Sequence, residues 1–312
     1  IDSSGNEVWT FSGHTDDVRG IAVDSNGNVY SASYDNTVKK IDSSGNEVWT
    51  FSGHTDDVGG VAVDSNGYVY TGSYDSTVKK IDSSGNEVWS FSGHTSRIRA
   101  IAVDSNGNVY SVSQDDTLKK IDSSGNEVWT FTGFNINPLC IVINSIEGYL
   151  YASGYDQVIK KIDLSTGNEN TSEGWPFTGH TSYVYGLAID SVGNLYSASL
   201  DDTVKKIDSS GNELWSFSGH TNGVLTVAVD SNGNVYSGSR DNTVKKIDSS
   251  GNLVWTFSGH TEFVSGVAVD SNGNVYSASQ DDTLKKIDSS GNEVWTFSGH
   301  TNFVYSVAVG TG

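Results

Sequence analysis

The chain has 312 residues, with 18 lysine and arginine side chains against 38 aspartate and glutamate side chains and a formal net charge of -20. An electric field of that sign repels phosphate backbones and anionic lipids, so we expect no nucleic-acid partner. The single cysteine, Cys140, excludes a disulfide within the chain, and no apolar run approaches the length of about 20 residues that a membrane span needs, so we expect a soluble protein.

One segment of 40 residues recurs along the whole chain. The first copy reads IDSSGNEVWTFSGHTDDVRGIAVDSNGNVYSASYDNTVKK, and the fourth and fifth copies are lengthened to 41 and 45 residues. Further copies begin at Ile41, Ile81, Ile121, Ile162, Ile207 and Ile247, and a shortened copy runs from residue 287 to residue 312. A fixed period of this size is typical of propellers and solenoids. Because the copies leave no residues for a linker, we predict a single domain over residues 1–312.

Each copy predicts four short strands joined by tight turns. In the second copy, Glu47–Phe51 alternates in polarity and places two large aromatic side chains on one face. Val58–Val63 follows with small side chains, and Val69–Ser73 and Thr77–Ile81 complete the set. The turn at 64–67 reads Asp-Ser-Asn-Gly, in which the aspartate can close the turn and the glycine can adopt a positive φ. No segment has the period of a helix, which predicts an all-β protein.

These strands predict a β-propeller. A lone four-stranded sheet cannot bury both of its faces, whereas sheets stacked radially in a closed ring can. We predict an all-β propeller of four-stranded antiparallel blades with seven blades; the alternative is eight blades, the last one incomplete. The chain begins with a copy of the outer strand, Glu7–Phe11, and ends with a copy of the inner strand, Val304–Val309. A seven-bladed ring would use one redundant outer strand as a clasp.

Every copy carries residues that resemble the WD repeat. The pair Gly13-His14, the later turn residue Asp35 and the strand end Ile41-Asp42 fall at the spacings of that family. The family has a tryptophan before the last aspartate, where this chain has isoleucine. The tryptophan of IDSSGNEVW is instead similar to the tryptophan-docking repeat of quinoprotein-type propellers, and AVDSNGNVY is similar to repeats of other bacterial propellers. All these relatives share the propeller architecture.

The WD-repeat resemblance implies a buried hydrogen-bond network in each blade, running from a histidine through a serine to an aspartate. Its members would be His14, Ser33 and Asp35 in the first copy and His54, Ser73 and Asp75 in the second. These are also the residue types of a nucleophilic triad, but an enzyme needs one such set at one open site, and this set recurs from copy to copy. In the fourth copy Phe134 and Gly154 replace the histidine and the serine together. We therefore interpret the set as structural.

Two further patterns suggest ligands but fit folding better. The eight tryptophans could be sugar platforms, yet each one alternates with an apolar aromatic residue on a strand, which favours core packing. Turns such as 24–27 (Asp-Ser-Asn-Gly) lack the ligand number and spacing of a calcium loop. Phosphate-binding glycine loops, paired carboxylates and Cys/His clusters are missing from the sequence. We predict no catalytic residue, no cofactor and no metal.

The copies differ mainly in two places, which we call the variable positions: the residues after Gly-His-Thr and the residue before the turn aspartate. In the WD-repeat family both places lie on one rim of the ring, where partners dock. Apart from fourteen lysines in Lys-Lys pairs, the basic residues are four arginines, and all four occupy variable positions. The candidate partner-binding residues are Arg19, Tyr34, Tyr74, Arg97, Arg99, Gln114, Tyr155, Tyr183, Tyr185, Leu200, Arg240, Phe263, Gln280, Phe303 and Tyr305.

This pattern predicts a non-enzymatic binding scaffold. Tyrosine and arginine are enriched in interfaces and often dominate their binding energy, so the expected partner is a protein or a peptide. A surface lectin or adhesin with repeated weak glycan sites is the main alternative, and a quinoprotein-type enzyme is the third. Substitution at exposed loop positions after a recent duplication would also produce the variation. The sequence leaves the oligomeric state and the compartment open.

Overall fold

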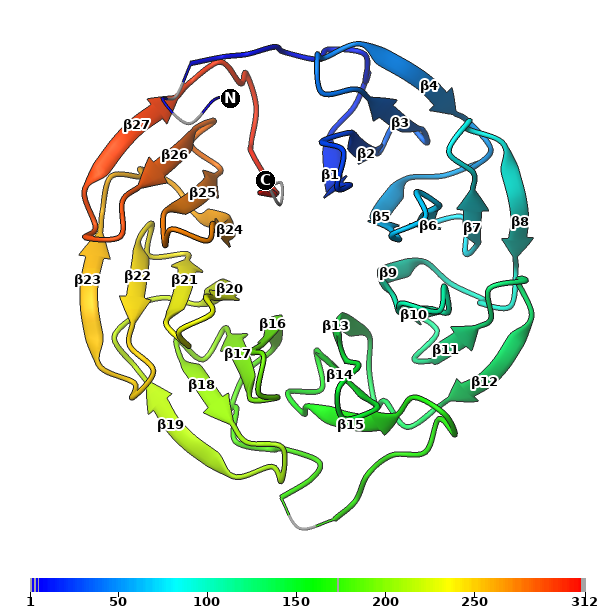
Figure 1. Ribbon diagram of the computed structural model, residues 1–312. Coiled ribbons are helices and arrows are strands. Elements are labelled where there is room, and N and C mark those ends of the chain that lie inside the picture. Colours follow the sequence, from blue (N-terminus) through cyan, green and yellow to red (C-terminus); the bar gives the residue numbers. More distant parts are fainter. Residues whose placement is uncertain (1, 3, 5, 173, 310–312) are drawn as a thin grey trace. The chain divides into compact units, whose positions relative to one another are not determined.

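A computed structural model describes residues 2, 4, 6–172 and 174–309, and every regular element in this part of the chain is a β-strand. The strands form seven antiparallel sheets, and within each sheet neighbouring strands follow one another in the sequence (Figure 1). Because these residues contain no helix, none of them offers a helical membrane span.

The first three sheets have four strands each. Their bounds are β1 (Val18–Val23), β2 (Val29–Ser33), β3 (Val38–Ile41) and β4 (Glu47–Phe51); β5 (Val58–Val63), β6 (Val69–Ser73), β7 (Val78–Ile81) and β8 (Glu87–Phe91); and β9 (Ile98–Val103), β10 (Val109–Ser113), β11 (Leu118–Ile121) and β12 (Glu127–Phe131). These bounds match the predicted strands to within one residue.

The fifth, sixth and seventh sheets repeat this arrangement. Their bounds are β16 (Val184–Ile189), β17 (Leu195–Ser199), β18 (Val204–Ile207) and β19 (Glu213–Phe217); β20 (Val224–Val229), β21 (Val235–Ser239), β22 (Val244–Ile247) and β23 (Leu253–Phe257); and β24 (Val264–Val269), β25 (Val275–Ser279), β26 (Leu284–Ile287) and β27 (Glu293–Phe297).

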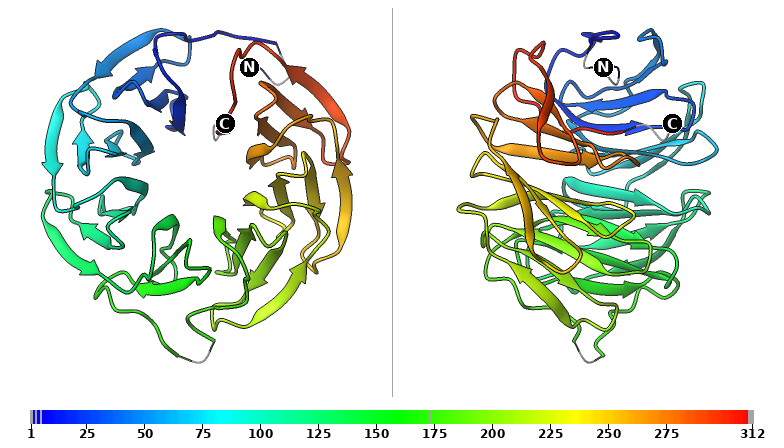
Figure 2. Two further views of the ribbon diagram at one scale, coloured as in Figure 1. Left: turned by 180° about the vertical axis from the view of Figure 1, so that it is seen from behind. Right: turned by 60° about the vertical axis from the view of Figure 1, so that its left-hand side comes forward.

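The fourth sheet has three strands, β13 (Pro138–Asn144), β14 (Tyr149–Gly154) and β15 (Lys160–Asp163). The long segment after β15 runs outside the sheets, where it is green in Figure 2, and takes the place of an outer strand. Two isolated bridges, Ile159 with Phe177 and Ile162 with Glu169, pair this segment with the edge of the sheet. The insertion in the fifth copy therefore removes a strand from the preceding sheet.

The contacts divide the chain into two compact units. One unit contains residues 8–150 and 162–169, and its neighbouring sheets pack through β1, β5, β9 and β13. The other contains described residues of 1–7 together with 151–161 and 170–309, and its neighbouring sheets pack through β16, β20 and β24.

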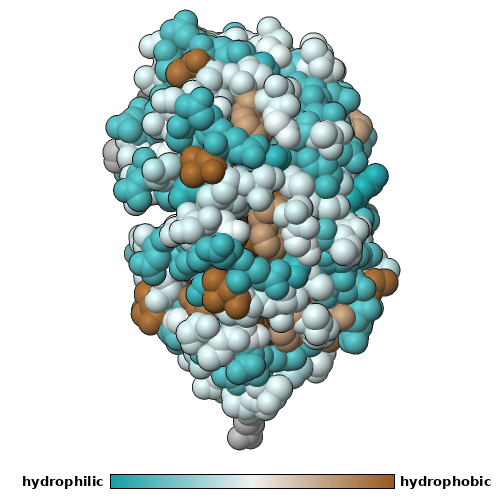
Figure 3. All heavy atoms as spheres, turned by 90° about the vertical axis from the view of Figure 1, so that its right-hand side faces the viewer, coloured by the Kyte–Doolittle hydropathy of each residue, from teal (hydrophilic) through white to brown (hydrophobic). Residues whose placement is uncertain are grey.

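The core of each unit lies between adjacent sheets. One buried cluster combines Tyr70 and Val78 from the second sheet with Ile98, Val109 and Ile121 from the third. Because each cluster draws on two sheets, a single sheet cannot bury these side chains alone. On the face seen in Figure 3, apolar residues form separate spots in a hydrophilic surface rather than a continuous patch.

The tryptophans connect neighbouring copies. Trp49 Nε1 donates to the carbonyl oxygen of Ser83 at 3.1 Å, and the Trp49 ring packs against Gly85 and Tyr30. Gly85 has a φ of +89°, and a Cβ built there would lie 2.8 Å from Trp49 Cγ. The predicted packing role is confirmed, although the rings are half-buried and the neighbouring phenylalanines are the more buried residues.

The strands predicted at the two chain ends are wrong. Residues 7–11 and 304–309 form no strand, and the last sheet closes with β27, which comes from the shortened copy that begins at residue 287, while the outer strand predicted at 7–11 is not used. The backbone of residues 305–307 does run past β24: a Cβ on Gly266 would lie 3.2 Å from the carbonyl oxygen of Tyr305. Val304 N donates to Ser279 O at 3.0 Å, but a strand needs a ladder of backbone hydrogen bonds to its neighbour, and neither segment belongs to a sheet.

Candidate binding surface

The structure brings the two variable positions together. Within a copy they share a backbone hydrogen bond, as when Tyr74 N donates to Asp57 O at 2.8 Å and Gln114 N donates to Arg97 O at 2.9 Å. Between copies their side chains meet, since the Tyr74 ring of the second copy contacts Arg97 of the third. We call the side chains at these positions the junction surface, because several of their contacts span the junction of two adjacent copies.

In the unit containing residues 8–150, the junction surface is a stack of rings and guanidinium groups. Arg19 lies over the Tyr34 ring, with its Cζ 4.5 Å from the ring centroid. The Tyr34 and Tyr74 hydroxyls are 3.0 Å apart. Burial and this hydrogen bond raise the pKa of Tyr34, so its hydroxyl stays protonated at neutral pH. Arg97 and Arg99 lie over Tyr74 at 4.7 and 5.4 Å.

The same stack is polar and internally bonded. Arg99 Nη1 donates to the Tyr74 hydroxyl at 3.0 Å, and the Gln114 side chain accepts from the Arg99 guanidinium. Arg19 Nη2 pairs with Asp17 Oδ2 at 3.1 Å. Burial, together with the neighbouring carboxylates, raises the pKa of Asp57. Positive and negative charge therefore alternate across this part of the surface.

In the unit containing residues 170–309, the junction surface is mostly aromatic. The Tyr155 ring meets Tyr183 edge to face at 4.6 Å and Tyr185 at 6.5 Å. Arg240 lies between two rings, with its Cζ 5.9 Å from the Tyr185 centroid and 5.7 Å from the Phe263 centroid. One cation is thus enclosed by aromatic side chains.

The remaining variable residues of this unit extend the apolar character. Leu200 packs against Gly223, where a Cβ would lie 2.5 Å from Leu200 Cδ2. Phe303 and Tyr305 lie edge to face at 6.1 Å, and Phe303 is 48% exposed. Gln280 joins the surface through its backbone, which donates to Phe263 O at 2.9 Å.

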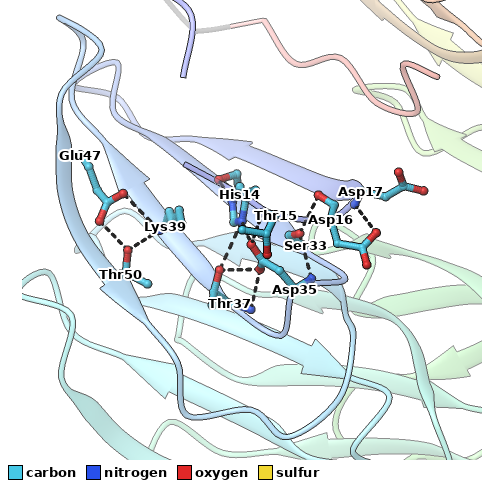
Figure 4. Close-up of polar contacts among 11 residues, drawn as sticks. His14, Thr15, Asp16, Asp17, Ser33, Asp35, Thr37, Lys39, Glu47 and Thr50 are labelled. Carbon is cyan, nitrogen blue, oxygen red and sulfur yellow. Dashed lines mark hydrogen bonds and ion pairs between the residues drawn. The ribbon is translucent and has the colours of Figure 1, made fainter. Parts of the chain in front are cut away.

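The histidine network has a different order from the predicted one (Figure 4). His14 Nδ1 donates directly to Asp35 Oδ2 at 2.8 Å, and His14 Nε2 accepts from Ser31 Oγ at 2.7 Å. Ser33 does not lie between them: its hydroxyl accepts from Asp35 N and donates to Asp16 O, which holds the loop. The second copy is the same, since Asp75 accepts from His54, Thr71 takes the place of Ser31, and Ser73 holds the loop through Asp56.

Two threonines complete the network around each carboxylate. Thr37 Oγ1 donates to Asp35 Oδ1 at 2.6 Å, and Thr15 N donates to Asp35 Oδ2 at 3.0 Å. Burial opposes ionisation of Asp35, but the hydrogen bonds from Thr37, Thr15 and His14 outweigh it and lower its pKa to about 2. Burial also lowers the pKa of His14, so its imidazole is neutral at neutral pH. The set is closed upon itself, and this arrangement stabilises the blade.

The fourth copy has lost the whole network except its aspartate. Phe134 replaces the histidine and packs edge to face on Phe131 at 5.2 Å, as the histidines do on their own phenylalanines. Ala152 and Val158 stand where the other copies have the two hydroxyl residues that touch the histidine. This joint loss is the signal by which the sequence could have identified the correct members.

A shallow polar depression of about 160 Å³ lies between the turns of the sixth and seventh sheets. Asp230 and Asn232 line it from one turn, and Asp270 and Asn272 line it from the other. Asp230 already accepts hydrogen bonds from its own turn and from Tyr236, so little of its capacity is left for a ligand. Among the described residues, no group of three His, Cys, Asp or Glu side chains could hold a metal ion.

A solved protein structure has the same architecture as this chain. The crystal structure of the computationally designed Ika8 protein superposes with a TM-score of 0.87 and 27% sequence identity, covering 98% of this chain and 94% of that one. The fold is an all-β seven-bladed β-propeller of mostly four-stranded antiparallel blades, as predicted.

The sequence families agree with the fold. The family described as outer membrane protein assembly factor BamB matches residues 35–137, 74–175 and 200–308, and the WD domain, G-beta repeat family matches residues 5–42 and 172–208. The chain therefore belongs to the family of BamB-like propeller repeats and also carries WD repeats, which confirms both resemblances. A search of curated protein sequences gave no match.

Proposed function

We propose that the protein is a non-enzymatic scaffold that binds a protein or peptide through the junction surface. The observation that carries the proposal is that the residues that differ between otherwise near-identical copies contact one another and are mainly tyrosine, phenylalanine and arginine. Such side chains supply a large contact area with a polar end, which suits an interface. Tyr183 is 39% exposed and Phe303 is 48% exposed, so part of this surface faces solvent.

The histidine networks and the tryptophans support the proposal by exclusion. Apart from Nε1 of Trp295, their polar atoms are bonded within the fold, and they recur from copy to copy, which favours a role in folding over one in recognition. The junction surface varies from blade to blade, which is expected where one partner is read by several different side chains.

The test is a capture experiment with two variants, Tyr34→Ala combined with Tyr74→Ala, and Arg240→Ala. We expect the wild type to retain a defined partner and at least one variant to lose about tenfold or more in affinity, because truncated interface anchors commonly cost about 2 kcal/mol. A matched control, Val88→Ala combined with Val128→Ala, removes exposed apolar side chains from the outer strands β8 and β12.

Full retention of every partner by both variants would refute the proposal. A glycan array separates the lectin alternative: binding to glycans that survives Arg240→Ala and requires several blades would favour repeated sugar sites over a protein interface.

A further inference from the structure

Arg240 is held in an unusual way for a surface cation. Its guanidinium group lies between the rings of Tyr185 and Phe263, each within cation–π distance. Its Nε is buried and has no hydrogen-bond partner, and its backbone N is fixed by a bond to Gly223 O at 2.8 Å. The side chain of Arg240 is therefore partly buried beside two aromatic rings.

The charge of Arg240 is not balanced by a nearby carboxylate. Among the described residues, none pairs with it, although the chain carries a net charge of -20. The adjacent Asp241 is occupied, since it accepts from His220 and Thr243. Arg19 differs, because it pairs with Asp17.

The chemistry of this arrangement favours a planar anion. A guanidinium group presents parallel N–H donors that match the two oxygens of a carboxylate, and a local environment poor in water strengthens that pair. The rings of Tyr185 and Phe263 beside it, and the Tyr155 ring that contacts Tyr185, offer apolar surface for a neighbouring side chain. Because the whole protein is acidic, its long-range field does not attract an anion, so recognition at this place has to depend on short-range contacts.

We infer that Arg240, flanked by Tyr185 and Phe263, binds the carboxylate of an aspartate or glutamate side chain in a partner peptide, next to an apolar or aromatic residue. This inference rests on the proposed function and names the chemistry of the partner. The junction surface around Tyr34 and Tyr74 does not offer the same site, because carboxylates such as Asp17 and Asp57 already lie there.

A displayed library of short random peptides tests the inference. Peptides selected on the wild-type protein are remade with each acidic residue changed to its amide, and their affinities are measured for the wild type and for Arg240→Gln. We expect one acid-to-amide change to weaken binding about tenfold, in the range that a desolvated ion pair supports, and Arg240→Gln to remove that difference. Arg97→Gln is the matched control, because Arg97 also stacks on a tyrosine ring, and it should leave the difference intact.

The outcomes separate the inference from the proposed function. Peptides that need Tyr155 or Tyr183 but bind equally well as acid and amide would overturn the carboxylate site and leave the binding function standing. The inference would also be overturned if Arg240→Gln weakened the binding of the acid peptide and of the amide peptide by the same factor. A library without any binder would count against both. Circular dichroism and thermal unfolding of each variant establish that it is folded.

Discussion

Each histidine network is a small buried polar set whose members satisfy one another. In the second copy His54 connects Asp75 with Thr71, and Thr77 donates to the same aspartate at 2.6 Å. Burial opposes ionisation of Asp75, yet the hydrogen bonds from His54 and Thr77 leave its pKa below the usual range. Burying such a set costs little free energy when every polar group has a hydrogen-bond partner. Removing one member destabilises the fold, because it leaves the groups that it bonded buried without that partner.

The fourth copy provides a reference for testing this cost. His54→Phe alone should lower the free energy of unfolding by about 1–3 kcal/mol, because it removes one hydrogen bond from the carboxylate of Asp75 and leaves the buried hydroxyl of Thr71 without the imidazole. Adding Thr71→Ala and Thr77→Val, which imitates the fourth copy, should cost less than the sum of the single changes. Urea unfolding measures the energies, and strictly additive losses would contradict the coupling.

At this scale the sequence predicted the residue types of the network but not their order. The WD-repeat resemblance put Ser33 between histidine and aspartate, whereas Ser31 is the hydroxyl that reaches the imidazole. On a strand these two serines point to the same face, so period and spacing cannot separate them. The contact is decided by the path of the loop that carries His14, which no local pattern reports.

Among the elements, the contact between a tryptophan of one copy and a glycine turn of the next sets the spacing of neighbouring blades. Trp49 reaches the turn at Gly85 and bonds to the Ser83 carbonyl in the same turn. A side chain at this glycine would have to displace the ring.

Gly85→Ala should therefore destabilise the protein more than Gly67→Ala. Both glycines have a positive φ, +89° and +80°, so both substitutions carry similar backbone strain of about 1–2 kcal/mol. A Cβ on Gly67 would meet only Ser83 Cβ at 4.0 Å, whereas on Gly85 it would lie 2.8 Å from Trp49 Cγ. We expect the extra loss to be about 1–3 kcal/mol in urea unfolding. Equal losses in the two variants would show that the docking contact contributes nothing.

The strands inside the copies could be predicted well, and the chain ends could not. Alternation and turn residues located β4 to β7 to within one residue, because those signals are local. The same pattern at 7–11 and 304–309 gave strands that the structure lacks, since pairing depends on a neighbour that the pattern does not include. The missing outer strand of the fourth sheet likewise depends on an insertion in the following copy.

In the whole molecule, the histidine networks of several copies contribute to stability in the same way and over the same range of pH. Six copies hold a histidine beside an aspartate at 2.8 or 2.9 Å. The lowered pKa of each aspartate means that its contribution to stability is present above its ordinary pKa of 3.8 and is lost as the pH falls through the folded value, about 2 for Asp35 and Asp281.

We therefore expect steep acid unfolding between about pH 4 and pH 2. If all six carboxylates take up protons together, stability should fall by up to about 8 kcal/mol for each pH unit. Between neutral pH and about pH 4.4, two effects change stability in opposite directions. As the pH falls, the lowered pKa of His14 reduces stability, because the unfolded state binds the proton more readily. Approach to the isoelectric point near 4.4 increases stability, because it reduces the repulsion between carboxylates.

Urea midpoints measured across this pH range, at low and at moderate salt, check the prediction. If moderate salt abolishes the acid-unfolding transition, repulsion between positive charges, rather than protonation of these carboxylates, causes it. A gradual decline that begins above pH 5 would contradict the role of the carboxylates.

The fold class and the blade number followed from the repeat, since a fixed period constrains the whole chain at once. The surface could be located from differences between copies, but its chemistry could not. Only the structure shows that Arg240 lies between two rings while Arg19 pairs with an aspartate. The two rings beside Arg240 lie far from it in the sequence, at Tyr185 and Phe263.

The pairwise nature of the junction contacts has a consequence for how such proteins diversify. A side chain before a turn aspartate contacts residues of the adjacent copies: Leu200 meets Gly223 of the next copy, whereas Arg240 meets rings of both neighbouring copies, so a substitution there needs accommodation from one or two positions. If the junction surface binds a partner, as we propose, its specificity can change at one junction between copies while the other junctions stay as they are. A chain assembled by copying itself in this way carries many independent places at which a new recognition property can begin.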